Sequence, residues 1–186
     1  MISVKTKRLT LRPLYLEDAA NLLPYFSDSE TCRYIPWEPR DLSGVEAFLD
    51  KWTNGRLPQN EEESLILGID LPGTGVIGQL NMTLKSTQHK HAEFGYVLNP
   101  AFRGEGYASE AVYGFVSYLI DSLNLHRLSA YVDERNKSSI KLLQNLGFRL
   151  EGRFVENEYF KGEWVTMLTF AMLASDWPEA RRSSNR

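Results

Sequence analysis

Short stretches of alternating hydrophobic and polar residues recur along the chain, and this period-two pattern is typical of strands with one buried face. The turn Pro72-Gly-Thr-Gly75 lies between two of these stretches and predicts a hairpin there. About seven strands follow from the pattern. They are expected at residues 7–14, 64–70, 76–84, 92–98, 127–132, about 148–157 and 164–173.

Hydrophobic residues at helical spacing predict about four helices, at residues 17–26, 45–52, 110–123 and 138–146. Asp41 or Ser43 could cap the second helix, and Asn54-Gly55 would end it. Because antiparallel strands come first and a strand–helix–strand–helix–strand order follows, we expect one α+β domain with a mixed, mostly antiparallel sheet. The domain is expected to span residues 1–176, with 177–186 as a flexible C-terminal tail.

Composition excludes several classes of protein. A hydrophobic content of 42% supplies a core, and a formal net charge of −3 argues against nucleic acid as a direct partner. Cys32 is the single cysteine and cannot form an internal disulfide, which favours a reducing, cytoplasmic setting. His89, His91 and His126 lack the spacing of a metal site, so no metal is expected. The sequence has no long apolar run, so neither a signal peptide nor a membrane span is expected.

The segment Arg103-Gly-Glu-Gly-Tyr-Ala108 joins the end of a predicted strand to the start of a predicted helix. The first N–H groups of a helix have no internal partner and attract anions. Gly104 and Gly106 allow close approach of a phosphate to the backbone, and Arg103 adds a positive charge. An ordinary strand-to-helix turn would also use glycines. A dinucleotide-binding turn fits less well, because its third glycine would fall at Ser109.

With these motifs in this order, nearly the whole chain resembles the GNAT acetyltransferase superfamily, and within it the ribosomal-protein N-terminal (Rim-type) acetyltransferases. The resemblance implies a single-domain GNAT-like fold and acetyl-coenzyme A (acetyl-CoA) as the acetyl donor. It rests on residues 6–13 and 76–78, Ala92-Glu-Phe-Gly-Tyr-Val-Leu-Asn-Pro100, Arg103-x-x-Gly106-x-Ala108, Asn136-x-x-Ser139, Leu146-Gly-Phe148 and Glu151-Gly152.

The resemblance also implies where coenzyme A binds. The turn at 103–108 would hold the pyrophosphate, and the strand ending Tyr96-Val97-Leu98 would pair with the pantetheine arm because its partner strand splays away. Asn136 would bind the pantetheine near its sulfur, although it could equally cap the helix that follows, and both roles can coexist. The implied cofactor-binding residues are Tyr96, Val97, Leu98, Arg103, Gly104, Glu105, Gly106, Tyr107, Ala108, Ser109 and Asn136.

Acetyl transfer to an amine requires a neutral amine and benefits from a hydrogen bond to the departing thiolate. Glu93, on the implied cofactor-facing strand, is the candidate base, directly or through water. It could instead be an exposed strand carboxylate or a salt-bridge partner of Lys90. Many superfamily members carry a tyrosine seven positions after the asparagine, where this chain has Leu143. Ser139 is therefore the candidate partner of the thiolate, as the Rim-type branch suggests, unless it is only a small packing residue.

Tyr34 and Trp37 lie where the resemblance places a wall of the acceptor site, although they could be core residues instead. Direct transfer is expected, because no base is placed beside Cys32 to make it an acetyl carrier. The sequence thus favours an N-acetyltransferase acting on a protein N-terminal α-amine of the ribosomal type. A small amine such as a polyamine, amino sugar or antibiotic is the alternative acceptor, and a non-catalytic acyl-CoA-binding module is a further alternative. A homodimer is possible from the resemblance alone.

Overall fold

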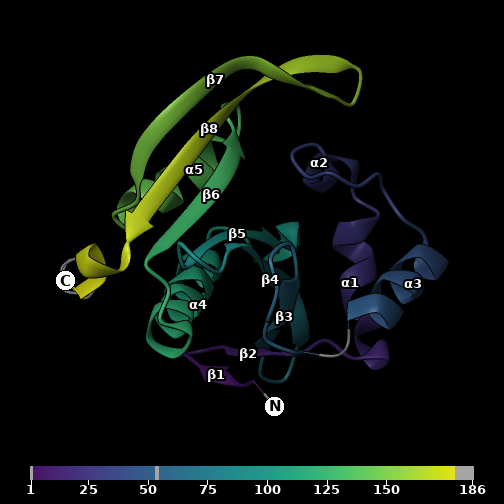
Figure 1. The fold of residues 1–186 in the computed structure, drawn as a ribbon. Coiled ribbons are helices and arrows are strands. Elements are labelled where there is room, and N and C mark those ends of the chain that lie inside the picture. Colours follow the sequence, from purple (N-terminus) through teal and green to yellow (C-terminus); the bar gives the residue numbers. More distant parts are fainter. Residues whose placement is uncertain (1, 53–54, 179–186) are drawn as a thin grey trace.

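A computed structural model describes residues 2–52 and 55–178. Eight strands form one sheet in the order β1-β2-β3-β4-β5-β6-β8-β7 (Figure 1). All neighbouring strands are antiparallel except β5 and β6, which are parallel. The strands are β1 (Val4–Lys5), β2 (Thr10–Arg12), β3 (Ser64–Leu71), β4 (Gly75–Ser86), β5 (His91–Leu98), β6 (Arg127–Asp133), β7 (Arg149–Phe160) and β8 (Glu163–Leu173).

Helices cover both faces of this sheet and enclose two hydrophobic clusters. The larger cluster joins α4 and α5 to one face, with Phe115 and Leu143 among its buried members. The smaller cluster joins α1 and α3 to the other face through residues such as Phe26 and Leu49. The α-helices are α1 (Ala19–Phe26), α2 (Ser29–Cys32), α3 (Leu42–Trp52), α4 (Tyr107–Leu123) and α5 (Lys137–Asn145).

The observed architecture confirms the predicted α+β domain with a mixed, mostly antiparallel sheet, now with eight strands and five α-helices. The strand predicted at 7–14 is wrong in its bounds, because only β2 falls within that range. A turn at residues 6–9 connects β2 to β1, which lies before the predicted segment. Asp41 caps α3, since its Oδ1 accepts from the Gly44 N–H at 2.9 Å. Ser43 only donates its hydroxyl to the same carboxylate. Asn54 lies outside the described residues.

The C-terminal boundary of the domain differs from the prediction at Trp177. Its side chain is only 1% exposed, and its ring lies 5.2 Å from that of Tyr113 on α4. Trp177 is therefore a core residue rather than part of a tail, while residues 179–186 lie outside the part of the chain that the structure describes. None of the described helices is long and apolar enough to span a membrane.

The parallel pair β5 and β6 separates after a short region of contact. Register partners run only from His91↔Arg127 to Glu93↔Ser129, although both strands continue beyond these residues. On its other side β5 stays paired with β4 as far as Gly78↔Leu98. The sheet therefore opens into a cleft between the second half of β5 and β6, and Figure 1 shows these two strands diverging.

Candidate active site

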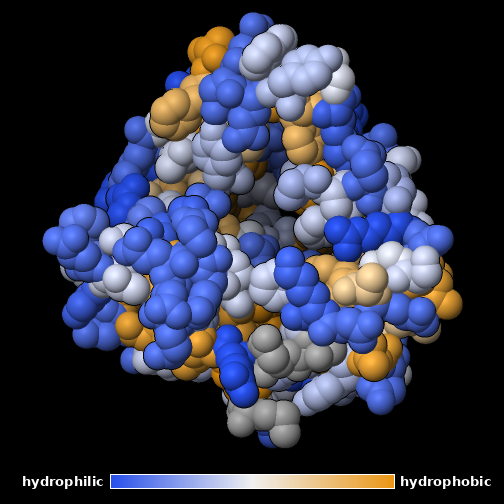
Figure 2. Space-filling model, turned by 45° about the vertical axis from the view of Figure 1, so that its right-hand side comes forward, coloured by the Kyte–Doolittle hydropathy of each residue, from blue (hydrophilic) through white to orange (hydrophobic). Residues whose placement is uncertain are grey.

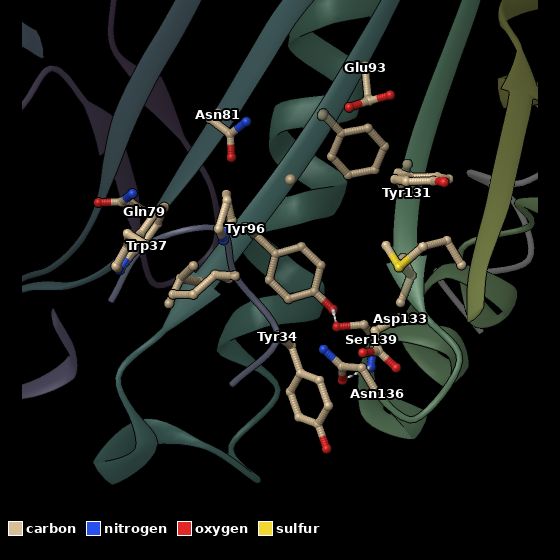
Figure 3. A pocket seen from close by; sticks show the side chains of 18 of the residues that line it. Tyr34, Trp37, Gln79, Asn81, Glu93, Tyr96, Tyr131, Asp133, Asn136 and Ser139 are labelled. Atoms are coloured by element: carbon tan, nitrogen blue, oxygen red, sulfur yellow. Dashed lines mark hydrogen bonds between the residues drawn. The ribbon is translucent and has the colours of Figure 1, made fainter. Parts of the chain in front are cut away.

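A central cavity of about 510 Å³ occupies the cleft where β5 and β6 part. Gly95, Tyr96 and Val97 line it from β5, and residues 130–133 line it from β6. Its remaining walls come from β3 and β4, from α3 and the loop between α2 and α3, from the start of α5 and from the β7–β8 hairpin. Figure 2 shows the molecular surface hollowed near the middle of one face. Segments far apart in the sequence thus meet at one site (Figure 3).

The turn before α4 has the geometry of an anion-binding loop. Gly104 and Gly106 have φ angles of +87° and +79°, in the left-handed region that favours glycine. Apart from Gly104 itself and its two chain neighbours, no described residue has a heavy atom within 4 Å of where a Cβ at Gly104 would be, so the space beside this backbone is open. Gly106 is the N-cap of α4, and no side chain caps the helix there. The N–H groups of the first turn, from Tyr107 onward, therefore fit a bound pyrophosphate.

Two arginines lie at this turn, and only one of them was predicted. Arg103 donates through Nη2 to Thr31 Oγ1 at 3.2 Å, so its guanidinium reaches α2. Arg8 donates to the Glu105 carbonyl at 3.0 Å, and its guanidinium carbon lies 4.4 Å from the centre of the Tyr107 ring. The sequence did not predict a role for Arg8 here, because Arg8 lies just before β2, 97 residues from Glu105 in the sequence. Glu110 holds it there through an ion pair of 2.7 Å.

The edge of β5 facing the cleft carries the predicted pantetheine-binding residues Tyr96, Val97 and Leu98. On the opposite edge these residues pair with β4, but none of them has a register partner in β6. A strand edge that faces a cleft can hydrogen-bond an extended amide-bearing chain as an added strand would. The pantetheine arm is such a chain, so the observed separation of the strands fits the predicted mode of binding.

Glu93 lies at the point where the two strands begin to separate, and its half-buried side chain lines the cavity. Burial raises the pKa of this carboxyl group above its usual range, while the nearby charge of Lys85 lowers it to a smaller extent. A raised pKa makes a carboxylate a stronger base. The structure brings Glu93 into the cavity rather than into the predicted alternative pairing with Lys90.

A second carboxylate in the cavity was not predicted. Glu158 of β7 lines the same wall as Tyr131 of β6, and its charge adds to the rise in the pKa of Glu93. The Tyr131 hydroxyl also accepts a hydrogen bond from the Asn157 side chain. The pairing of β7 with β8 is irregular between Phe154 and Glu158, so simple alternation along β7 does not reveal which side chains enter the cavity.

Asn136 and Ser139 lie at the start of α5, beside the cavity (Figure 3). The Asn136 Oδ1 atom accepts from the Ser139 N–H at 3.2 Å, which confirms the helix-capping role. Capping uses the oxygen, so the amide nitrogen of Asn136 can still donate to a ligand. The Ser139 hydroxyl accepts a hydrogen bond from the Tyr96 hydroxyl at 3.1 Å. Leu143 also lines the cavity, with only 1% of its side chain exposed.

The aromatic loop after α2 forms another wall of the cavity. Tyr34 and Trp37 both line the cavity. Trp37 also stacks on Phe26 of the smaller hydrophobic cluster, with 5.3 Å between ring centres, so it lies both at the cavity and against the core. The buried Trp37 Nε1 has no hydrogen-bond acceptor among the described residues. Lys161, at the tip of the β7–β8 hairpin, donates to the carbonyls of Cys32 and Trp37, each at 2.8 Å. The hairpin tip is thereby fastened to the aromatic loop.

Cys32 does not face the cavity. Its side chain is fully buried, its thiol donates weakly to the Phe26 carbonyl, and burial raises its pKa. Because the nucleophilic form of cysteine is the thiolate, a raised pKa disfavours an acetyl-carrying role.

Comparisons with known proteins agree with this geometry. The family model for the acetyltransferase (GNAT) domain matches residues 8–149. An uncharacterized N-acetyltransferase, p20, from Bacillus licheniformis is 34% identical over 178 residues, covering 95% of this chain and 99% of that protein. A GNAT-family acetyltransferase structure from Bacillus anthracis superposes with a TM-score of 0.84 at 26% identity, covering 94% and 99% of the two chains.

Two characterised relatives act on different amines. The [ribosomal protein uS5]-alanine N-acetyltransferase of Escherichia coli is 28% identical, covering 97% of this chain and 95% of that protein. The spermidine N(1)-acetyltransferase of the same species is 26% identical, covering 83% and 80%. The family model and the relatives agree on the reaction, although not on the acceptor. The chain belongs to the GNAT family and is an acetyl-CoA-dependent N-acetyltransferase.

Proposed function

We propose that the protein acetylates the α-amine at a protein N-terminus by direct transfer, with Glu93 as the base. The single observation that carries this is the position of Glu93, a half-buried carboxylate of raised pKa at the apex of the cleft. Acetyl-CoA supplies an acetyl group activated as a thioester. The residues at 103–108, the free edge of β5 and Asn136 would hold it, and Ser139 would donate a hydrogen bond to the departing sulfur.

The protons and bonds balance without a carrier residue. The amine nitrogen forms a bond to the acetyl carbon as the carbon–sulfur bond breaks, and its electron pair stays on sulfur. Glu93 accepts the proton lost by nitrogen, directly or through water, and later releases it to solvent. An α-amine has a pKa near ~8 against ~10.4 for lysine, so one carboxylate can supply enough neutral amine near neutral pH.

Amide side chains in the acceptor part of the cavity support a peptide substrate. Gln79 is buried and Asn81 half-buried, and both line the cavity on the side of Trp37. These amides offer N–H donors to the carbonyls of a peptide backbone, whereas a polyamine has no carbonyl to receive them. The similarity to the ribosomal uS5 enzyme, which spans nearly the whole chain, supports the same acceptor class.

A small cationic amine is the second candidate, and a specific observation favours it. Glu93 and Glu158 both line the cavity, and two carboxylates can attract an amine with more than one positive charge. Asp133 adds little to this attraction, because Arg135 pairs with it at 2.6 Å. The similarity to the spermidine enzyme points in the same direction.

An acceptor panel tests the proposal. Purified protein with acetyl-CoA would be given peptides with free Ala, Ser or Met ends, spermidine and an amino sugar, with release of free thiol as the readout and mass spectrometry of the products. We expect peptides to be acetylated on the α-amine with the highest kcat/KM. The same peptide with a blocked N-terminus and a free lysine is the matched control. Faster turnover of spermidine than of every peptide would overturn the peptide assignment.

A further inference from the structure

Tyr96 and Ser139 connect the two walls of the cleft through one hydrogen bond. Tyr96 extends from β5 and Ser139 lies in the first turn of α5, and Figure 3 shows the phenol pointing at the serine. The Tyr96 hydroxyl donates to Ser139 Oγ at 3.1 Å. Both side chains line the central cavity, so this contact lies where the thioester is expected rather than in the core.

The direction of this hydrogen bond determines what the serine can do. A serine hydroxyl has one proton and two lone pairs, and Tyr96 occupies one lone pair. Within a helix, a serine commonly donates its proton back to the carbonyl three or four residues earlier. No described carbonyl accepts a hydrogen bond from Ser139 Oγ, and the Asn136 oxygen is taken by the Ser139 and Ser138 donors. The hydroxyl proton of Ser139 is therefore available to a ligand in the cavity.

Two further features support this arrangement. Burial raises the pKa of the Tyr96 hydroxyl, so the phenol stays protonated and remains a donor at neutral pH. Leu143 lies one helical turn after Ser139 on the same face of α5 and also borders the cavity. An aliphatic side chain there cannot bond to sulfur. The phenol of Tyr96 instead enters the cavity from the opposite wall.

We propose that Tyr96 is a positioning residue that directs the Ser139 hydroxyl proton toward the sulfur of the bound thioester. The inference rests on the proposed function of this site. Tyr96 donates to Ser139, and Ser139 donates to sulfur as the carbon–sulfur bond breaks and the electron pair remains on the thiolate. No proton is transferred through the pair, so the balance of the reaction is unchanged. A hydrogen bond to a charged group is stronger than one to a neutral group. The hydrogen bond from Ser139 therefore stabilises the thiolate more than the sulfur of the intact thioester.

The most direct test measures the thiol pKa of bound coenzyme A, from the ultraviolet absorbance of the thiolate during a pH titration, and needs no turnover. The variants are Tyr96→Phe, which removes one oxygen, Ser139→Ala and the double variant. Tyr118→Phe is the matched control, because Tyr118 is a partly buried tyrosine on α4 outside the cavity. We expect both single variants to raise the bound thiol pKa by about one unit, and the double variant to raise it no further.

Turnover provides the second readout. Tyr96→Phe and Ser139→Ala should each lower kcat about tenfold, with the KM for acetyl-CoA within about twofold of wild type. The double variant should match Ser139→Ala, because Tyr96 acts through Ser139. A wild-type bound thiol pKa in Tyr96→Phe, or losses that multiply in the double variant, would overturn the proposal. If Tyr96→Phe does not fold, an unchanged bound thiol pKa in Ser139→Ala overturns it equally.

The proposed function can fail separately. Wild-type protein that acetylates no amine with Glu93 in place would reject the proposed function. Active wild-type protein whose bound thiol pKa is the same with and without the Tyr96 hydroxyl would reject only the role of Tyr96. A merely structural hydrogen bond would lower the melting temperature of both single variants and leave the thiol pKa unchanged, which also rejects that role.

Discussion

Glu93 and Ser129 are the last residues that β5 and β6 bring into register. The candidate base is thereby fixed by strand pairing on both sides, since Thr83 of β4 is its other partner. Immediately beyond it the strands separate and the cavity begins. A group that must accept a proton is thus held on rigid backbone at the edge of the space where the amine would bind.

Replacing Gly106 with valine should weaken coenzyme A binding by at least about tenfold, equivalent to about 1.4 kcal/mol. Valine resists the φ of +79° found at this N-cap, and its side chain would crowd a bound phosphate. Calorimetry measures the affinity. Gly73→Val is the matched control, because Gly73 has a φ of +81° in the distant β3–β4 turn. Both variants should lose similar stability, and equal affinity in both would contradict the phosphate role.

Glu93→Gln should lower kcat by about a hundredfold and flatten its pH profile. Burial raises the pKa of Glu93, so the wild-type rate should rise with pH as this carboxyl group loses its proton, and glutamine has no proton to lose. Rates measured across the acidic to neutral range test this. An equal proportional loss at every pH would show that Glu93 only positions the substrate.

The same substitution should stabilise the protein at neutral pH. Because the pKa of Glu93 is raised in the folded protein, folding favours the protonated form of this carboxyl group. The contribution of Glu93 to stability is therefore present below its unfolded-state pKa and is lost as the pH rises through its folded-state pKa. Glutamine avoids this loss. The melting temperature of Glu93→Gln relative to wild type should therefore increase from acidic to neutral pH, and a constant difference would contradict the burial of a charged carboxylate.

Lys161→Met should loosen the aromatic loop, because the ammonium group donates to the carbonyls of Cys32 and Trp37. Hydrogen exchange should increase at residues 32–37, and the KM for the amine should rise while the affinity for coenzyme A stays constant. Lys5→Met, in β1 far along the sheet, is the control. Unchanged exchange in the loop would show that the hairpin tip does not hold this wall.

Trp177→Ala should destabilise the protein by about 3–5 kcal/mol, the range for removing a buried aromatic side chain. The side chain is 1% exposed and packs on Tyr113. Denaturant titration measures the free energy of unfolding. A loss below about 1 kcal/mol would instead agree with the tail assignment made from the sequence.

Local patterns predicted most of the sheet and the four longer helices, because alternation or helical spacing persists over at least six residues in each of these segments. The helix α2 was not predicted, because four residues are too few to show a helical spacing of hydrophobic residues. Its N-cap, Asp28, is also a residue type common in polar turns. Trp177 was misplaced because a single buried residue after the last strand leaves no pattern. Its burial depends on Tyr113, which is distant in the sequence.

The candidate site divides in the same way. The turn at Gly104 and Gly106 could be predicted, since a helix N-terminus with flanking glycines is a local feature. The positions of Arg8, Glu158 and the Tyr96 hydroxyl could not, because each depends on contacts between distant segments. The roles assigned to Glu93, Ser139, Tyr34 and Trp37 stay predictions that the proposed variants can decide.

Calorimetric titration of the folded protein with acetyl-CoA, before and after Gly106→Val, tests the central claim most directly. The open backbone before α4 and the free edge of β5 predict a saturable heat for wild type that is strongly weakened in the variant. No measurable heat for wild type at millimolar acetyl-CoA, or equal binding by the variant, would contradict the claim that this cleft holds the acetyl donor.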